Sequence, residues 1–389
     1  MSEQFHRGSP GDDSGAGAGG RHAAPMSRLV IAGAAVAVVV VLVGAVTAFA
    51  AARQGRDANP GRSLAAAKPG AATAPSPGPA TKPAGGGTPT GGAKSATASA
   101  TATSSSQAGA KAPTRSATAA AKPGGFKTTF YDSFDGAAGT GLDTSKYRYD
   151  TGPGSKFGTG EIETMTDSTR NVFHDGRGHL VLRALHSGSD PASGWTSGRF
   201  ETNSSSFGAA KGGVVRMEAS IRQPNVTRTN GAGYWPAFWM LGNGLRNGGT
   251  WPAIGEVDIL EDINGRSSVF GTLHCGTNPG GPCGESTGIG SGEHSCGGCQ
   301  TGFHTYAVEI DRSQTPERIR WFLDGSNYFT LKQDRVDAAT WRNAVDHPFF
   351  IIFDLAIGGG FPSAFGGGPN AQTVSGGEMT IDYLAVYNR

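Results

Sequence analysis

The stretch EVDILEDINGRSSVFGTLH, residues 256–274, decides how the rest of the chain folds around it. It contains three carboxylates, Glu256, Asp258 and Glu261, in an otherwise apolar run. Side chains of a regular strand alternate between its two faces, so Glu256 and Asp258 share one face and Glu261 points to the other. The three acids can meet only if the strand is irregular.

A tight turn follows this run. Asn264-Gly265 is the strongest signal for a two-residue hairpin turn in the chain. Folding about it pairs Glu261 with Ser268, on the face that His274 also occupies. One β-bulge between Asp258 and Glu261 then pairs Glu256 with Thr272. The sequence therefore predicts a bulged hairpin with the three acids and His274 on one face.

This pattern of charges indicates chemistry. The alternative is the solvated face of an edge strand, but the other side of EVDIL is too apolar for that position. Carboxylates aligned along an internal strand suit acid, base and nucleophilic roles. Glu256, Asp258 and Glu261 are therefore candidate catalytic residues.

The rest of the C-terminal region has the period of strands. Short runs rich in β-branched and aromatic residues are separated by Gly-rich turns, at 179–185, 214–221, 305–311, 349–357 and 379–387. Asp324-Gly325 marks a second hairpin, and residues 336–343 one short helix. Strands and helices do not alternate, so the sequence predicts an all-β sandwich or jelly roll of two antiparallel sheets.

The first third of the 389-residue chain has a different composition. Residues 29–52 contain no charged side chain and are long enough to cross a bilayer as a helix. Residues 53–124 are almost wholly Ala, Gly, Pro, Ser, Thr and Lys, which predicts a disordered linker. We expect a cytoplasmic segment (1–28), a transmembrane signal anchor (29–52), the linker (53–124) and one domain (125–389).

Signals for export conflict with one another. Ala48-Phe49-Ala50 matches a cleavage site, so secretion after cleavage near Ala50 is an alternative to an anchor. Arginines are more numerous after the apolar segment than before it, which favours a cytoplasmic C-terminal part. A linker followed by a domain with all four cysteines favours export. We expect an extracellular, membrane-anchored domain.

Net charge separates the domain from its linker. After Gly125, 21 Lys and Arg stand against 27 Asp and Glu, about −6, whereas the linker has nine basic residues and one acid, about +8. A nucleic-acid-binding domain would have a basic cluster on its folded part, so we expect no such partner. The basic linker suits an anionic lipid or wall-polymer surface.

The cysteines Cys275, Cys283, Cys296 and Cys299 lie in one Gly-rich segment. They allow three disulfide pairings, and their spacing is also loosely compatible with zinc. Export favours disulfides. We predict the pairs Cys275–Cys283 and Cys296–Cys299, which would staple a loop at one end of a binding cleft.

Seven motifs in the domain are similar to those of glycoside hydrolase family 16. GEVDILE resembles the bulged catalytic strand of this family, and GTGEIETMT, SGRFET, GYWPAFWMLG, FHTYAVEID, IRWFLDG and DYLAVY follow the order seen in its laminarinase-like members. The resemblance covers residues 126–389. It implies a β-jelly roll that hydrolyses internal β-1,3-glucosidic bonds of a laminarin-like polysaccharide. It implies no cofactor for the chemistry, and we expect a monomer.

The resemblance also implies roles for the acids. Retaining hydrolysis uses two carboxyl groups about 5 to 5.5 Å apart, one as nucleophile and one as acid/base. By position, Glu256 would be the nucleophile and Glu261 the general acid/base. Asp258 would orient Glu256 and couple the two protonation states.

Other residues match sugar-contacting positions of the family. Trp235 and Trp239 share one strand face, where indoles can stack on pyranose rings, although both could instead fill the core. His274 matches a histidine beyond the catalytic strand, and a structural histidine is the alternative. The weaker matches are Glu161, Asn171 and Arg199, each of which could be an ordinary surface hydrogen-bonding group.

Calcium is the remaining question about cofactors. Many members of the family bind Ca²⁺ with an acid at the start of the domain and an aspartate in the last strand. Asp382 matches the second acid, but Ser133 stands where the first is common. Loss of a carboxylate weakens a site for a hard cation, so structural calcium at Asp382 stays open.

Several other functions stay open. The domain could hydrolyse a mixed-linkage glucan or a β-1,3-galactan, or it could be a wall transglycosylase, which transfers the sugar to another sugar instead of water. A non-catalytic glycan-binding module could use the same fold and tryptophans, but it would have little reason to keep two glutamates and an aspartate together.

Overall fold

The computed structural model describes residues 122–389. The predicted cytoplasmic segment and anchor, and nearly all of the predicted linker, lie outside the described residues. Within residues 122–389, no helix has both the length and the apolar character needed to span a membrane.

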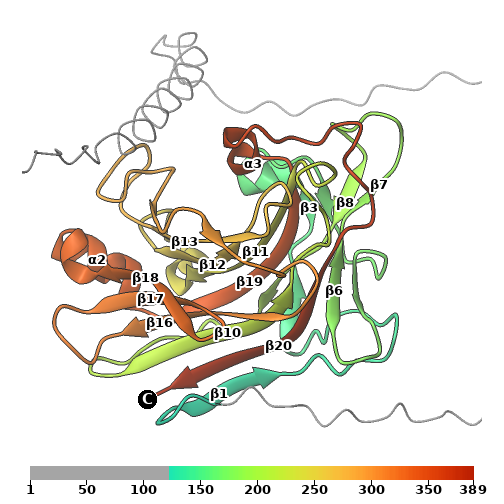
Figure 1. Cartoon of the computed structure of the whole chain (residues 1–389). Coiled ribbons are helices and arrows are strands. Elements are labelled where there is room, and N and C mark those ends of the chain that lie inside the picture. Colours follow the sequence, from blue (N-terminus) through green and yellow to red (C-terminus); the bar gives the residue numbers. More distant parts are fainter. Residues whose placement is uncertain (1–121) are drawn as a thin grey trace, which may run out of the picture. The chain divides into compact units, whose positions relative to one another are not determined.

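Two eight-stranded sheets stack face to face (Figure 1). We name the sheet that contains the three acids the front sheet; its order is β14-β13-β12-β11-β19-β9-β2, with β15 paired to β13. Its strands are β2 (Tyr147–Tyr149), β9 (Arg199–Thr202), β11 (Tyr234–Gly242), β12 (Glu256–Glu261), β13 (Ser268–His274), β14 (Ile289–Gly290), β15 (His294–Ser295) and β19 (Phe349–Ile357).

The opposite sheet is the back sheet, with the order β18-β17-β16-β10-β20-β6-β5 and β1 paired to β20. Its strands are β1 (Lys127–Asp132), β5 (Val172–His174), β6 (Leu180–Arg183), β10 (Val214–Arg222), β16 (His304–Asp311), β17 (Arg318–Leu323), β18 (Ser326–Lys332) and β20 (Glu378–Asn388). Neighbouring strands in both sheets are antiparallel, so the predicted all-β, jelly-roll-like sandwich is confirmed.

Smaller elements complete the fold. A four-stranded sheet that we did not predict joins β3 (Gly152–Pro153), β4 (Thr164–Met165), β8 (Trp195–Ser197) and β7 (Leu185–His186), and its β4–β8 pair is parallel. The helices are α2 (Ala338–Val345) and α3 (Gly360–Ala364), and the 3₁₀ turns are η1 (Gly154–Phe157), η2 (Asn243–Asn247) and η3 (Gln333–Arg335). Helix α2 is the predicted one, and Asp337 caps it by accepting hydrogen bonds from the N–H groups of Ala339 and Thr340.

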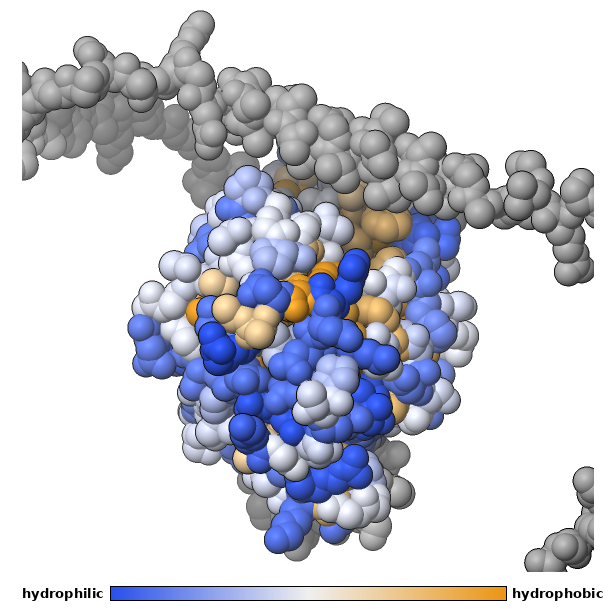
Figure 2. All heavy atoms as spheres, turned by 90° about the vertical axis from the view of Figure 1, so that its left-hand side faces the viewer, coloured by the Kyte–Doolittle hydropathy of each residue, from blue (hydrophilic) through white to orange (hydrophobic). Residues whose placement is uncertain are grey.

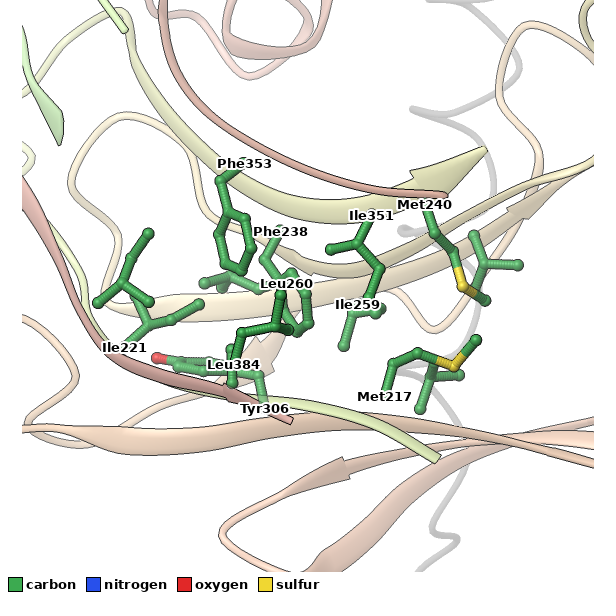
Figure 3. Close-up of a cluster of buried hydrophobic side chains, with 14 of the residues drawn as sticks. Met217, Ile221, Phe238, Met240, Ile259, Leu260, Tyr306, Ile351, Phe353 and Leu384 are labelled. Carbon is green, nitrogen blue, oxygen red and sulfur yellow. The ribbon is translucent and has the colours of Figure 1, made fainter. Parts of the chain in front are cut away.

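The core lies between the sheets, because alternate side chains of each sheet point toward the other. Figure 3 shows this contact between Met217, Ile221, Tyr306 and Leu384 of the back sheet and Phe238, Met240, Ile259, Leu260, Ile351 and Phe353 of the front sheet, all of them fully buried. Each such side chain contributes about 1.5–3 kcal/mol relative to an exposed one. On the face shown in Figure 2, hydrophilic residues predominate and hydrophobic ones form only small groups.

Strand β12 is bulged at the predicted place. On its β11 side, Asp258 pairs with Trp239 and Leu260 with Phe238, which leaves Ile259 as the extra residue. Ile259 and Leu260 are consecutive, yet both are buried in the core (Figure 3). A bulge adds one residue and so reverses the face of everything after it. Glu261 is thereby returned to the face of Asp258.

The register of the hairpin differs by two residues from our prediction. Glu261 pairs with Phe270 and not with Ser268, and Glu256 shifts by the same amount to pair with His274. Because the shift is even, every side chain keeps its predicted face.

A longer loop causes this shift. Asn264 and Gly265 form the expected turn, with φ values of 56° and 62°, but Ser267 also has a positive φ of 56°. Asp262 accepts hydrogen bonds from the N–H and hydroxyl groups of Ser268. These contacts close the loop one step further from the turn than a two-residue hairpin would.

A residue of the back sheet secures the bulge. The indole N–H of Trp321, on β17, donates to the carbonyl oxygen of Asp258 at 2.7 Å. Gly271 lies on β13 between the partners of Asp258 and Glu261, and a Cβ there would come within 2.6 Å of the Trp321 ring. The close approach therefore requires glycine at this position.

Candidate active site

The structure brings Glu256, Asp258 and Glu261 to one face of β12. Their neighbours Val257, Ile259 and Leu260 point into the core, so the acids point away from it. Asp258 and Glu261 are 5% and 9% exposed, whereas the Glu256 side chain is 15% exposed. The three carboxylates, which we call the front acids, are thus shielded but reachable from outside the sandwich.

His274 is the nearest cationic group. Its Nε2 lies 3.4 Å from Oδ2 of Asp258 and 3.8 Å from Oε1 of Glu256, and its Nδ1 lies 2.7 Å from Oε2 of Glu285. Burial alone would lower the pKa of His274, but the close contact with Asp258, the hydrogen bond to Glu285 and the charges of Asp258 and Glu256 outweigh it and hold the pKa well above its usual value. His274 is therefore an imidazolium at neutral pH.

Protons are held unequally by the two glutamates. Burial and the charge of Asp258 raise the pKa of Glu256 and hold that of Glu261 well above its usual value. The charges of His274 and Arg199 act against this at Glu256, whereas His274 and a Trp235 hydrogen bond oppose it at Glu261. With two cations near it, Glu256 ionises more readily, and Glu261 is the better holder of a proton.

The predicted tryptophans lie beside the acids. On β11, Trp235 donates its indole N–H to Oε1 of Glu261 at 2.9 Å, and Trp239 donates to Oδ1 of Asp354 at 2.6 Å. Both are half-buried, while Phe238 between them fills the core. The alternative that both tryptophans are core residues is therefore wrong.

Arg199 lies at one end of this row. Its guanidinium is 4.9 Å from the centre of the Trp239 ring and 4.2 Å from that of Phe157, and its Nε donates to Asp150 at 3.1 Å. Burial raises the pKa of Asp354, and the charge of Arg199 opposes this rise without cancelling it. Arg199 is thus held rigidly between two aromatic rings next to the front acids.

Glu161 belongs to the same end of the sheet. It bridges to Gly358, is buried, and accepts a hydrogen bond from the Thr159 hydroxyl. Its charge, added to the effect of burial, raises the pKa of Glu163 to about 9. Two neighbouring buried glutamates, Glu161 and Glu163, therefore lie where we predicted one candidate.

Asn171 is buried and makes structural hydrogen bonds. It is 2% exposed, and its amide donates to the carbonyl of Arg183 and the hydroxyl of Thr196, while its oxygen accepts from Thr166. These contacts use the amide hydrogens, so Asn171 ties strands together, and its sugar contact stays a prediction. The long-range partners Arg183 and Thr196 could not be read from its local sequence.

We did not predict two side chains of the candidate site, Asp354 and Glu285. Asp354, buried on β19, accepts the indole N–H of Trp239, and its one signal was a lone acid in the apolar run FFIIFDLAI. Glu285 contacts His274 from a Gly-rich loop, and only its closeness to Cys283 pointed to it.

The disulfides Cys275–Cys283 and Cys296–Cys299 form as predicted. Cys275 directly follows His274, so the first disulfide lies beside the front acids. The sulfur atoms of Cys296 and Cys299 lie with His304 in a group that could hold a metal ion, but disulfide sulfurs are not the thiolates that zinc requires. The zinc alternative is therefore wrong.

Two further groups bear on metal binding. Glu256, Asp258 and His274 offer ligand atoms within 4.8 Å of one another, but a protonated His274 has no lone pair for a metal. Asp382 accepts a hydrogen bond from Ser220 and lies 4.0 Å from His179, and it belongs to no group of three potential ligands within residues 122–389. These side chains do not fit a calcium site built from several carboxylates.

Surface hollows do not mark the site. Two hollows of about 380 Å³ each lie elsewhere, one lined by Asp132, Asp135 and His174 and the other by Arg177, Arg183 and Arg222 among others. Neither is lined by the front acids. The candidate site is defined by its acids and indoles.

A two-sheet β-sandwich with acids and indoles on adjacent strands has the organisation of a polysaccharide hydrolase. A family model described as "XgeA-like, catalytic GH16 domain" matches residues 225–301, which include the front acids. The chain is 33% identical over 259 residues to a β-glucanase of Rhodothermus marinus, which covers 63% of this chain and 80% of the relative. This chain belongs to glycoside hydrolase family 16.

Two further relatives agree with this assignment. The crystal structure of an endo-1,3-β-glucanase from Streptomyces sioyaensis is 47% identical, covers 69% of this chain and 99% of that one, and superposes with a TM-score of 0.66. A glucan endo-1,3-β-glucosidase of Cryptopygus antarcticus is 31% identical over 232 residues, or 57% of this chain and 77% of the relative.

Proposed function

We propose that this chain is a retaining endo-β-1,3-glucanase that hydrolyses internal bonds of a laminarin-like β-glucan. The observation that carries the proposal is the bulge at Ile259, which turns Glu256, Asp258 and Glu261 to one face beside Trp235 and Trp239. The names of two relatives, from Streptomyces sioyaensis and Cryptopygus antarcticus, support a β-1,3-glucan as substrate, and the name of the Rhodothermus marinus relative supports a β-glucan.

In the first step, the Glu256 carboxylate attacks the anomeric carbon of the bound sugar. The glycosidic C–O bond breaks, and its oxygen takes the proton that Glu261 holds. The indole N–H of Trp235 fixes Oε1 of Glu261, which leaves the other carboxyl oxygen to deliver the proton. The product of this step is a glycosyl ester on Glu256.

In the second step, water replaces the ester. Formation of the ester removes the charge of Glu256, so the pKa of Glu261 falls and Glu261 can accept a proton from the attacking water. Asp258 and the imidazolium of His274 stay in contact throughout and hold the orientation of Glu256. Apart from the attacking water, both steps use only side chains of the protein, and the chemistry needs no cofactor.

The glycan would lie along the indole face. Trp235 and Trp239 offer flat surfaces for pyranose rings, and Arg199 offers donors for hydroxyl groups. Glu161, at the same end, offers an acceptor.

The location of the enzyme is part of the proposal. The apolar segment 29–52 supports anchoring in a membrane, and the two disulfides support an extracellular domain. We expect this domain to act as a monomer. Protease added to intact cells should remove the activity into the medium. Activity that becomes accessible only after lysis would contradict this location.

A substrate panel tests the function. The full-length chain would be incubated with laminarin, lichenan, β-1,3-galactan and agarose, with Glu256→Gln as the inactive control. We expect rapid shortening of laminarin into oligosaccharides. Preferential cleavage of another glycan would change the assigned substrate. Products longer than the input would indicate transglycosylation, and binding without cleavage would indicate a glycan-binding module.

A further inference from the structure

Glu285 is a buried acid that the proposed reaction does not use. Its side chain has no exposed surface. One carboxylate oxygen lies 2.7 Å from Nδ1 of His274, and the other accepts the backbone N–H of Cys275 at 2.7 Å. The carboxylate thus grips two consecutive residues at the end of β13.

The loop that presents Glu285 is closed in two ways. The Cys275–Cys283 disulfide closes the segment that ends two residues before Glu285, and the backbone groups of Gly280 and Glu285 hydrogen-bond to one another in both directions. Cys275 is also the residue whose N–H Glu285 accepts. The disulfide therefore ties Cys275, the neighbour of His274, to Cys283, two residues before Glu285, and restrains the separation of Glu285 and His274.

His274 connects this loop to the front acids. Its Nδ1 faces Glu285, and its Nε2 faces Asp258 and Glu256 at 3.4 and 3.8 Å. A neutral imidazole has a single N–H, so it would turn a lone pair toward a carboxylate on one side. Both contacts are favourable only when the ring is an imidazolium.

Glu285 and the front acids favour that state together. Glu256, Asp258 and Glu261 act on it from β12, the Trp251 ring packs against it at 5.7 Å between centres, and Arg199 on β9 acts on Glu256. Within residues 122–389, His274 is the single cationic side chain in ion-pair distance of Glu285. A buried carboxylate is costly unless it is paired, so the fold keeps Glu285 for this contact.

We infer that Glu285 is a positioning residue for the proposed hydrolysis: its hydrogen bond keeps His274 as an imidazolium directed at Asp258 and Glu256, and the Cys275–Cys283 disulfide holds it in that place. This inference rests on the proposed function for its catalytic consequence. The charge on His274 itself is independent of any substrate.

Glu285→Gln separates charge from shape. The amide oxygen can still accept the N–H of Cys275, so we expect the fold and both disulfides to persist. The amide cannot supply the charge, so His274 should lose its proton at a pH about 1 to 3 units lower than in the parent chain, as expected when an adjacent opposite charge is removed. ¹H–¹³C NMR of the His274 ring in the substrate-free, full-length chain measures this directly.

Glu285→Gln acts on Glu256 in two opposed ways: loss of the Glu285 charge lowers the pKa of Glu256, whereas loss of the His274 charge raises it and is the larger effect. With His274 neutral, Asp258 and Glu256 lose their closest cation, and Glu256 ionises at higher pH. The acid limb of the kcat profile on laminarin should move up by about one pH unit, with KM unchanged. The matched control is Glu293→Gln, which removes a glutamate paired with Arg266 and Arg228 and should leave the profile in place.

The disulfide is tested by a Cys275→Ser, Cys283→Ser double variant, which should move the acid limb in the same direction as Glu285→Gln. A double variant with the parent profile would overturn the role of the tether. An unchanged His274 titration in Glu285→Gln would overturn the whole inference, whether or not activity fell. If the pKa of His274 shifts in Glu285→Gln but no glucan in the panel is cleaved, the proposed function fails. The effect of Glu285 on the charge of His274 then still holds.

Discussion

Two clusters of buried carboxylates lie on opposite faces of the sandwich, and they differ in their partners. The front acids have His274 and Arg199 near them. The acids on the outer face of the back sheet, Glu218, Glu309 and Asp311, are called the back acids, and each pairs with arginine. Arg216 pairs with Glu218 and Glu309, Arg320 with Glu309, and Arg318 with Asp311, at distances from 2.5 to 3.1 Å.

Burial alone therefore does not make an active site. The back acids are 2–6% exposed, which is as little as Asp258 and Glu261. Burial opposes ionisation of Asp311 as well, but hydrogen bonds from Ser313 and Arg318 lower its pKa, whereas the pKa values of Glu256 and Glu261 are raised. The shortage of arginine partners is what leaves protons mobile among the front acids.

Replacing one glutamate from each cluster should have opposite effects. Glu256→Gln removes the proposed nucleophile, and we expect kcat on laminarin to fall by about 10⁴-fold or more with no loss of thermal stability. Glu309→Gln leaves Arg216 and Arg320 short of a charged partner, so we expect unchanged kcat and a free energy of unfolding lower by about 1.5–3 kcal/mol. Reducing-sugar assays and denaturant titrations measure the two. Similar losses of activity in both variants would remove the distinction.

The need for Glu261 should depend on how strongly the leaving group requires protonation. Glu261→Gln cannot donate a proton, so hydrolysis of laminarin should slow by about 10² to 10⁴-fold. An aryl β-glycoside with an acidic phenol leaves without protonation, so its first step should slow much less. Equal losses on the two substrates would argue against Glu261 as the acid.

Glu163 tests how a buried carboxyl group that has no arginine partner affects stability. Glu163 accepts the N–H of Ile357, and its pKa rises from 4.5 to about 9 in the fold. The folded state therefore holds a proton that the unfolded chain releases, and this contribution to stability is present below pH 4.5 and is lost as pH rises toward about 9.

We accordingly expect the unfolding temperature to fall between about pH 5 and pH 9, and to fall less in Glu163→Gln, whose neutral amide does not titrate. Calorimetry across this range provides the measurement. Parallel curves for the two proteins would show that Glu163 does not cause the decline.

The smallest expected effect concerns calcium. Asp382 contacts Ser220 and lies near His179, and Ser133 donates to Asp135 where family members often have an acid. With this set of ligands, we expect the unfolding temperature to be nearly the same in EDTA and in millimolar CaCl₂. A clear rise with calcium would show that backbone oxygens complete a site after all.

Alternation along the strands made much of the fold predictable. The parity of Glu256 and Glu261 required a bulge, and the apolar pair Ile259 and Leu260 could absorb it. The register was not predictable, because it depends on Asp262 reaching Ser268 beyond the turn.

Side-chain partners that lie far apart in the sequence explain the other misses. Asp354 contacts Trp239 on the adjacent strand, and Asn171 has a structural role through Arg183 and Thr196 that we did not predict. Glu285 reaches His274 because of the path of a loop. Local patterns contain no information on such contacts.

The central claim is that Glu256 attacks the sugar directly from the same strand that supplies the acid. Two inversions at the anomeric carbon then release the β-anomer, whereas a water-mediated single displacement needs acids about 6.5 to 9.5 Å apart and inverts the centre. Proton NMR of the new reducing end in the first minutes of laminarin hydrolysis, before mutarotation, decides between them. We expect the β-anomer to appear first; initial appearance of the α-anomer would contradict the nucleophilic role of Glu256.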